Sequence, residues 1–309
     1  MHTHLSQIVK EALEVQCREF TDLIEEATQL LSKENGQIGS FNITGRLVQL
    51  QPLGEAIIVS DLHGDLESLT KIIEETNFLQ KIKQKKKPFL IFLGDYGDRG
   101  IQSTEVYFII LKLKCLFPKQ VILMRGNHEG PEDLLAYPHD LPMQLHMKFG
   151  KKWKDVYSKI WKLFKHLYNA VLIEEHYLLI HGGLPPKAKT LRDLAYAHIK
   201  HPRERLLEDM LWSDPAENIN KVCESPRGAG KLFDEKTTDE MLRKFNVNIL
   251  IRGHEPSRDG FKINHKGKVL TLFSRKGPPY FNVYGAYLNI EFSRKFEKAE
   301  QLIHFIHKF

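Results

Sequence analysis

The chain has few cysteines and no long apolar run, and each shortage excludes a class of protein. Its 309 residues include Cys17, Cys115 and Cys223, which lie far apart and form no CxxC pair. This spacing argues against a disulfide framework or a thiolate zinc site and predicts a reducing, cytoplasmic setting. No apolar stretch reaches the roughly 18 residues of a membrane span. Residues 1–5 lead into a Lys- and Glu-bearing helical pattern without the apolar core of a signal peptide.

The charge balance is moderately basic. The net charge is +6 and the isoelectric point is about 9.0. Much of the excess lies in residues 81–87, a Lys-rich run that predicts a solvated loop before a strand. Outside this run, Lys and Arg are not interleaved with aromatic residues in a stripe, so no nucleic-acid partner is predicted.

The spacing of apolar residues predicts a helical extension followed by an α/β domain. Residues 5–33 repeat apolar side chains at helical intervals, and residues 41–51 read as extended chain with a turn. Further on, short apolar runs alternate with helical stretches, as in α/β folds. We predict an extension over residues 1–50 packed on a catalytic domain over residues 51–309, in one folded unit. The later helices are expected at residues 66–78, 103–117, 155–170 and 294–309.

Five apolar runs share one feature, which is that polar residues able to bind metals follow each run at once. Each run has the length of a buried strand. Side chains at the ends of different strands converge on one rim of an α/β domain. The runs are residues 56–59, 89–93, 121–124, 177–180 and 249–251.

The residues after these runs can hold two metal ions. Asp61 and His63 are two apart, so an extended chain points both to one side, and this donor pair suits Mn, Fe or Zn. With Asp95 they can hold one ion. The second set would be Asp95, Asn127, His181 and His254, which makes Asp95 the bridge. Two divalent ions are therefore predicted, with Mn²⁺ expected in vitro and Fe or Zn as alternatives; such a pair can clamp a phosphate.

Each pattern alone has a simpler explanation. Residues 94–100 combine carboxylates with Arg99, whose planar fork matches a phosphate, but a Gly- and Asp-rich turn is the alternative. A single His after a strand is more often structural. Five such strand ends in one chain favour a metal centre.

The sequence resembles the phosphoprotein phosphatase family of metal-dependent serine/threonine phosphatases, which includes the type 1 and type 2A catalytic subunits. The resemblance covers residues 56–291 and implies a calcineurin-like metallophosphoesterase fold, a central β-sandwich flanked by helices. Its motifs are residues 60–64 (SDLHG), 94–100 (GDYGDRG), 126–129 (GNHE), 181–183 (HGG) and 253–254 (GH), with further similar segments at 211–215, 227–228, 259–260 and 271–274.

The resemblance implies hydrolysis of phosphoserine and phosphothreonine by direct attack of a metal-bridging hydroxide. His128 would be the general acid for the leaving alkoxide, and Asp98 would orient it. Phosphorylated proteins are implied as substrates and regulatory subunits as further partners. The implied phosphate- and substrate-binding residues are Arg99, Asn127, Arg227 and Tyr280, of which the two arginines also count as catalytic.

The chain departs from the family pattern in four places. Ser60 replaces a glycine and Gly97 replaces a valine; neither is a ligand, so activity is expected. Residues 274–281 differ from the family's Ser-Ala-Pro-Asn-Tyr loop, and residues 130–150 lack its usual sequence after GNHE. These departures predict a divergent, prokaryotic or archaeal member.

Two other functions fit part of the pattern. Related phosphoesterases cleave dinucleoside polyphosphates, cyclic nucleotides or nucleic-acid phosphodiesters. Residues 98–100 favour the phosphoprotein phosphatase branch, which includes dinucleoside tetraphosphatases, and residues 211–215 and Arg227 favour protein phosphatases within it. A catalytically inactive module that binds phosphorylated partners is disfavoured, because every metal-binding and charged position of the motifs is present.

Overall fold

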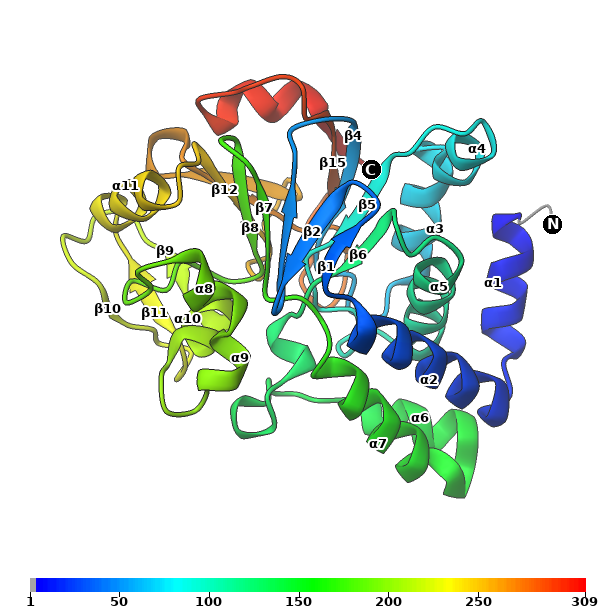
Figure 1. Ribbon diagram of the computed structural model, residues 1–309. Helices are drawn as coiled ribbons and strands as arrows, with labels where there is room; N and C mark the ends of the chain where they lie inside the picture. Colours follow the sequence, from blue (N-terminus) through cyan, green and yellow to red (C-terminus); the bar gives the residue numbers. More distant parts are fainter. Residues whose placement is uncertain (1–3) are drawn as a thin grey trace.

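A computed structural model describes residues 4–309, so residues 1–3, on which the signal-peptide prediction partly falls, lie outside it. Two sheets form the centre of the molecule (Figure 1). The five-stranded sheet has the order β16 (Ile306–Lys308), β15 (Ala286–Glu291), β4 (Glu55–Val59), β5 (Phe89–Phe92) and β6 (Val121–Leu123). The eight-stranded sheet has the order β1 (Gly36–Ile38), β2 (Phe41–Thr44), β3 (Leu47–Leu50), β7 (Ala170–Ile173), β8 (Tyr177–Ile180), β12 (Ile249–Arg252), β14 (Val269–Leu272) and β13 (Phe261–Asn264).

Alternation along the strands shows how the eight-stranded sheet is layered. In β8, Tyr177 and Leu179 belong to the core shared with the five-stranded sheet, whereas Leu178 and Ile180 belong to a second core on the other face. Successive side chains of a strand point to opposite faces, so this sheet is buried on both sides. The predicted β-sandwich with flanking helices is confirmed.

Helices cover both outer faces of the sandwich (Figure 1). One group lies beside the five-stranded sheet: α1 (Leu5–Glu14), α2 (Cys17–Lys33), α3 (Leu66–Glu75), α4 (Phe78–Lys83), α5 (Ser103–Leu116), α6 (Leu141–Phe149) and α7 (Trp153–Phe164). The other group is α8 (Leu191–Ala195), α9 (Ala197–Lys200), α10 (Leu206–Trp212) and α11 (Glu235–Lys244), close to a small sheet of β10 (Cys223–Glu224), β11 (Lys231–Phe233) and β9 (Asp214–Pro215). None of the described helices is long and apolar enough to cross a membrane.

The first 50 residues contribute strands as well as helices. The strand β3 pairs in parallel with β7, which places β1–β3 at one end of the eight-stranded sheet. The boundary at residue 50 stays a prediction.

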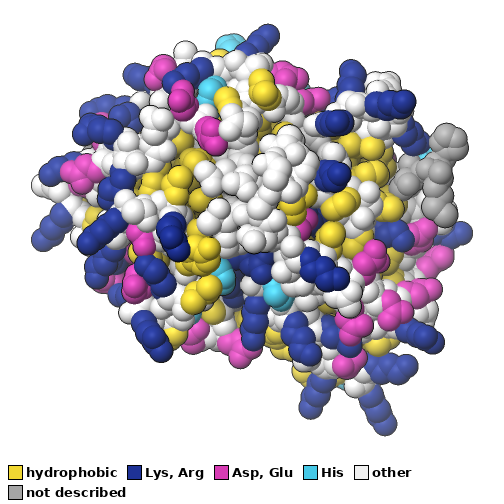
Figure 2. All heavy atoms as spheres, viewed as in Figure 1, with side chains coloured by type: hydrophobic (Ala, Val, Ile, Leu, Met, Phe, Trp, Pro, Cys, Tyr) yellow, Lys and Arg dark blue, Asp and Glu magenta, His cyan; other side chains and the backbone are white. Residues whose placement is uncertain are grey.

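Cys17, Cys115 and Cys223 are free thiols. On the face that Figure 2 shows, Lys and Arg side chains are interspersed with Asp and Glu.

Two predicted helices and the predicted Lys-rich loop have different bounds in the structure. The helix expected at residues 66–78 is broken, because Asn77 adopts a left-handed conformation (φ 52°) between α3 and α4. The helix expected at residues 155–170 ends at Phe164, and β7 begins at Ala170. The Lys-rich run is helical up to Lys83 in α4.

The helix predicted at residues 294–309 was wrong. A short 3₁₀ helix at Ala299–Phe305 is followed by β16, which pairs antiparallel with β15. Without this pairing β15 would be an edge strand with unpaired backbone groups. Backbone hydrogen bonding to the sheet therefore overrides the helical spacing of these residues.

Candidate metal centre

Strand ends from both sheets bring the predicted ligands to one rim. The strands β4, β5 and β6 run parallel, and β8 runs parallel to β12. The residues that follow these strands converge because parallel strands end at the same edge of a sheet. All six predicted ligands, Asp61, His63, Asp95, Asn127, His181 and His254, are buried there.

The loops at this rim hold non-glycine residues in the left-handed region. The φ angle is 43° at His63, 58° at Asp95 and 73° at His254. Such conformations cost about 1–3 kcal/mol each and cluster at functional sites. Gly126 permits the close packing, since a Cβ there would lie 2.1 Å from Asp95 Oδ1. Three of the six predicted ligands thus have a strained backbone.

The first ligand group is Asp61, His63 and Asp95. His63 Nε2 lies 3.9 Å from Asp61 Oδ1 and 3.5 Å from Asp95 Oδ2. His63 Nδ1 donates to the Gly97 carbonyl at 3.0 Å, which leaves Nε2 with its lone pair toward the carboxylates. Burial lowers the pKa of His63 to about 3, so its imidazole is neutral at pH 7, as a metal ligand must be.

The second ligand group surrounds the Asn127 side chain. Asn127 Oδ1 lies 3.0 Å from both His181 Nε2 and His254 Nδ1, and 3.0 Å from Asp95 Oδ2. His181 Nδ1 donates to the Leu93 carbonyl at 3.1 Å, which directs Nε2 toward Asn127 and Asp95. Although burial alone would lower the pKa of His181, the carboxylates of Asp95 and Asp61 raise it to about 9, so a cation bound here would displace a proton from Nε2. In this orientation the amide oxygen faces only other acceptors. Amide, carboxylate and imidazole atoms that converge in this way, and that can all act as acceptors, form the donor set of a cation.

The donor chemistry therefore fits two divalent ions. The carboxylate of Asp95 belongs to both groups, because its Oδ2 is also 3.4 Å from His181 Nε2. Nitrogen and oxygen donors of this kind suit Mn, Fe or Zn. The ligating atoms of Asp95, His181 and His254 lie within 4.8 Å of one another, as do those of His63, Asp95 and His128.

His128 lies beside the first ligand group and is held by Asp98, a carboxylate that belongs to neither group. Its Nδ1 donates to Asp98 Oδ2 at 2.7 Å, which leaves Nε2 for the cavity that the ring lines. Burial alone would lower the pKa of His128, but Asp95 and Asp98 raise it above the usual value. Against the effect of burial, hydrogen bonds from His128 and His139 hold the pKa of Asp98 well below its usual range. This arrangement favours a protonated imidazole.

The remaining predicted site residues line a cavity of about 510 Å³ over the two ligand groups. Arg99 donates to the Tyr137 carbonyl at 2.7 Å, and its Nε is buried without a partner among the described residues. Arg227 Nε donates to Asp214 Oδ2 at 2.6 Å. The Tyr280 ring lies 5.3 Å from the His63 ring, centroid to centroid. Two guanidinium groups and a phenol therefore face the predicted metal site.

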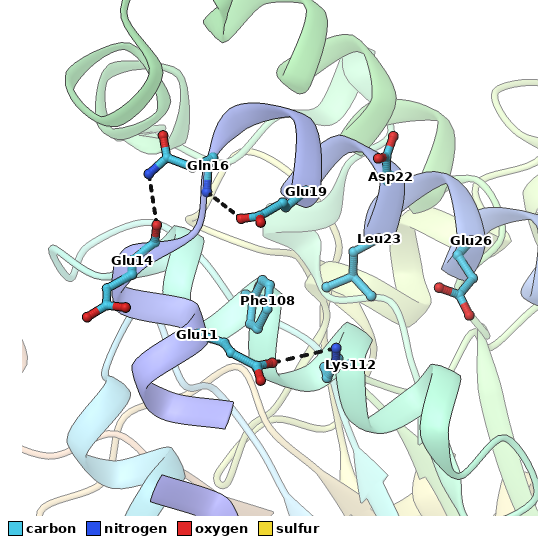
Figure 3. Close-up of a pocket in the computed structure, with 9 residues that line it drawn as sticks. All are labelled: Glu11, Glu14, Gln16, Glu19, Asp22, Leu23, Glu26, Phe108 and Lys112. Atoms are coloured by element: carbon cyan, nitrogen blue, oxygen red, sulfur yellow. Dashed lines mark hydrogen bonds and ion pairs between the residues drawn. The ribbon is translucent and has the colours of Figure 1, made fainter. Parts of the chain in front are cut away.

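A second cavity of similar size carries no such chemistry. It measures about 490 Å³ and lies between α1, α2 and α5 (Figure 3). Its polar groups serve the helices: Gln16 N donates to Glu19 Oε2 at 3.1 Å as part of a capping box, and Glu11 pairs with Lys112 at 3.6 Å. We therefore place the functional site at the strand ends.

Both departures within the motifs fit the local packing. Ser60 Oγ donates to Asp61 Oδ2 and so holds a predicted ligand. A Cβ on Gly97 would lie 2.8 Å from Cε2 of Tyr107, so a valine there would require the ring to move. The ring of Tyr107 thus occupies the space that a valine side chain would need at position 97.

Two supporting carboxylates were missed by the sequence reasoning. Glu129 accepts from the backbone N–H groups of Asp95 at 2.8 Å and Gly126 at 2.9 Å, which ties the second and third motif loops together. Asp214 accepts from Arg227 and, at 2.8 Å, from the buried Arg252. Glu129 and Asp214 both lie inside segments that resemble the family, and this position could have identified them from the sequence.

Comparison with known proteins agrees with this geometry. Residues 56–258 match the calcineurin-like phosphoesterase family. A probable serine/threonine-protein phosphatase of Encephalitozoon cuniculi is 34% identical, over 74% of this chain and 48% of its own length. The catalytic subunit of serine/threonine-protein phosphatase 4 of Saccharomyces cerevisiae is 32% identical, over 70% of this chain and 68% of its own. The chain thus spans about half the length of the first relative.

Solved structures share the fold. A protein serine/threonine phosphatase from Saccharomyces cerevisiae superposes with a TM-score of 0.76 at 24% identity, covering 98% of this chain and 95% of that chain. A cold-active protein-tyrosine phosphatase from a psychrophilic Shewanella species has a TM-score of 0.57 at 18% identity, covering 81% and 78%. At these identities the likeness establishes the architecture alone, and it agrees with the predicted metallophosphoesterase fold.

Proposed function

The chain belongs to the phosphoprotein phosphatase family of calcineurin-like phosphoesterases, and we propose that it is a metal-dependent phosphatase that hydrolyses phosphoserine and phosphothreonine in proteins. The observation that carries the proposal is the position of Asp95. Its Oδ2 lies 3.5 Å from His63 Nε2 and 3.4 Å from His181 Nε2, so one carboxylate faces both ligand groups. Bound at these groups, two divalent ions would supply Lewis acidity and activate water for attack on phosphorus.

The residues that would hold the ions form two sets that share Asp95. Asp61, His63 and Asp95 form the first set, and Asp95 with one amide and two imidazoles forms the second. Mn²⁺ is our expectation in vitro, with Fe and Zn compatible with the same donors. The second set is Asp95, Asn127, His181 and His254.

His128 is proposed as the general acid. A serine or threonine alkoxide is a poor leaving group and needs a proton as the P–O bond breaks. The Asp98 carboxylate accepts from His128 Nδ1 at 2.7 Å and thereby keeps Nε2 directed away from itself. This pair would deliver the proton while the ligand groups hold the ions.

The phosphate would be held by the charged residues at the cavity wall. Arg99 and Arg227 present guanidinium groups, which bind phosphate oxygens through paired N–H donors. Asp214 anchors Arg227 in this position. Asn127 would also help to hold the phosphate, and Tyr280, which lines the same cavity, would contact the substrate.

Substrates and partners follow from the same proposal. Phosphorylated proteins are the proposed substrates. The word "subunit" in the name of the yeast relative motivates a proposal of regulatory subunits for this chain as well. We propose a cytoplasmic location, which accords with free cysteines and with no helix suited to a membrane among the described residues.

The test is phosphate release from a phosphothreonine peptide. The protein is stripped with a chelator and assayed with and without Mn²⁺, beside Asp95→Asn. We expect turnover that requires the metal and is abolished in the variant, because Asp95 faces both groups. Mn²⁺ binding without phosphate release from the peptide, together with cleavage of diadenosine tetraphosphate, would move the assignment to a nucleotide phosphoesterase.

A further inference from the structure

The segment of residues 130–150, which departs from the family sequence, brings a second histidine onto Asp98. His139 Nδ1 lies 2.8 Å from Asp98 Oδ2, the same oxygen that His128 Nδ1 reaches at 2.7 Å. The His139 side chain exposes 9% of its surface. One carboxylate oxygen is therefore shared between the proposed general acid and a histidine that no motif contains.

The same segment holds the rest of the Asp98 loop. The backbone N–H of Leu141 donates to Asp98 Oδ1 at 2.7 Å, and Asp140 Oδ2 accepts from the Arg99 N–H at 3.0 Å. Asp98 and Arg99 have left-handed backbone conformations, with φ of 65° and 68°. Residues 139–141 thus fix both oxygens of the carboxylate and the strained backbone that carries it.

His139 is itself fixed from its other side. Its Nε2 lies 2.7 Å from the hydroxyl of Tyr157 on α7, and its ring lies 5.7 Å from the Tyr157 ring and 6.5 Å from that of Trp161. The ring therefore cannot turn away without losing both hydrogen bonds and this aromatic packing. A continuous chain of hydrogen bonds runs from Tyr157 through His139 and Asp98 to His128.

We propose that His139 is a positioning residue for proton delivery: by holding Asp98, it fixes the imidazole of His128 in the orientation that presents Nε2 to the leaving oxygen. The inference rests on the proposed function, since it assumes that His128 is the general acid. Without His139, the Asp98 carboxylate loses a donor on the oxygen that aligns His128 and gains rotational freedom. A misaligned acid slows the reaction in proportion to how much the leaving group needs the proton.

The leaving group therefore separates positioning from general damage to the site. A threonine alkoxide depends on protonation, whereas p-nitrophenolate is a stable anion that leaves without it. For His139→Ala we expect kcat on a phosphothreonine peptide to fall by about 10–100-fold, less than the roughly 10²–10⁴-fold that general acid catalysis contributes, because the acid itself remains. On p-nitrophenyl phosphate the change in kcat should stay within about 3-fold. KM for both substrates and the content of bound Mn²⁺ should be unchanged.

Three further variants make the test specific. His139→Asn keeps an N–H donor close to the position of Nδ1, so it should recover most of the peptide activity. His146→Ala, at an exposed histidine of α6, the helix that follows the loop of His139, should match the wild type on both substrates. Tyr157→Phe removes the outer hydrogen bond and should give a smaller loss confined to the peptide.

Several results would overturn the inference. An equal loss on both substrates would make His139 a structural residue, and no loss in His139→Ala would remove it from the reaction. If His139→Ala fails to fold, parallel losses on the two esters in Tyr157→Phe decide against positioning. A wild-type protein that hydrolyses p-nitrophenyl phosphate but never the peptide would instead sink the proposed function, and this inference with it.

Discussion

The carboxylate of Asp95 joins the site together through contacts of a few ångströms. Its Oδ2 faces both ligand groups, its Oδ1 accepts from the His128 N–H at 3.0 Å, and its own N–H donates to Glu129 at 2.8 Å. The position of the metal site and the position of the proposed acid therefore depend on the same residue. Its left-handed backbone (φ 58°) is maintained by these contacts.

Substitution of His128 separates the roles of acid and ligand. The ligating atom of His128 lies within 4.8 Å of those of His63 and Asp95, so a metal-binding role is a concrete alternative. Because Asp98 occupies its Nδ1, we expect His128→Asn to retain both ions and to lose about 10²–10⁴-fold in kcat. Metal content by mass spectrometry and steady-state kinetics on a phosphothreonine peptide check this. Loss of an ion in the variant would identify His128 as a ligand and contradict the proposed role.

At the same scale, the sequence predicted site residues that follow a strand or belong to a segment similar to the family, and it missed His139. The six predicted ligands meet because each lies in the short loop that follows a buried strand, and an apolar run followed closely by Asp, Asn or His is visible in the sequence. His139 follows no strand and belongs to no motif. Its approach to Asp98 depends on the packing of α6 against α7, which spacing along the chain does not encode.

At the scale of an element, helix α10 buries the carboxylate of Asp209 without a cation close enough to compensate its charge fully. Asp209 exposes 1% of its surface, its Oδ1 has no partner among the described residues, and its Oδ2 is 4.0 Å from Lys231 Nζ. Burial raises its pKa from 3.8 to about 6. The folded protein thus holds this proton more tightly than the unfolded chain does, so stability decreases as pH rises from about 4 to about 6 and stays reduced above.

Asp209→Asn should remove this loss. We expect the variant to match the wild type near pH 4 and to be more stable by about 2–3 kcal/mol at pH 7, since one unit of pKa difference corresponds to about 1.4 kcal/mol. Urea unfolding at a series of pH values measures the difference. Asp155→Asn on α7, whose side chain is 69% exposed, is the control and should show no such trend. A constant difference at all pH values would mean that packing, and not ionisation, sets the effect.

Elements were predictable where their own residues decide the structure. The two N-terminal helices and the five strands at the rim follow from apolar spacing. The last residues of the chain do not, because β16 forms only where β15 offers a free edge. The break at Asn77 likewise depends on a backbone conformation that helical periodicity does not report.

At the scale of the whole molecule, the buried ion pair of Glu34 and Lys114 links the end of α2 to the five-stranded sheet. Lys114 of α5 is fully buried and donates to Glu34 Oε1 at 2.7 Å, while Tyr168 donates to the other oxygen of Glu34. Lys114 also donates to the Val121 carbonyl at 3.1 Å, at the start of β6. The N-terminal helices are therefore connected to the core by charge as well as by apolar packing.

We expect Glu34→Gln to destabilise the entire protein by about 3 kcal/mol, because removing one partner of a buried pair leaves the other charge uncompensated. Since Trp153 and Trp161 lie on α7, which packs against α2, tryptophan fluorescence and far-ultraviolet circular dichroism should report one shared urea transition in wild type and variant. Glu11→Gln breaks the half-exposed pair with Lys112 and should cost under about 1 kcal/mol. Two separate transitions, the first carrying the loss of far-ultraviolet circular dichroism from α1 and α2, would show that the N-terminal extension unfolds on its own and would contradict a single folded unit.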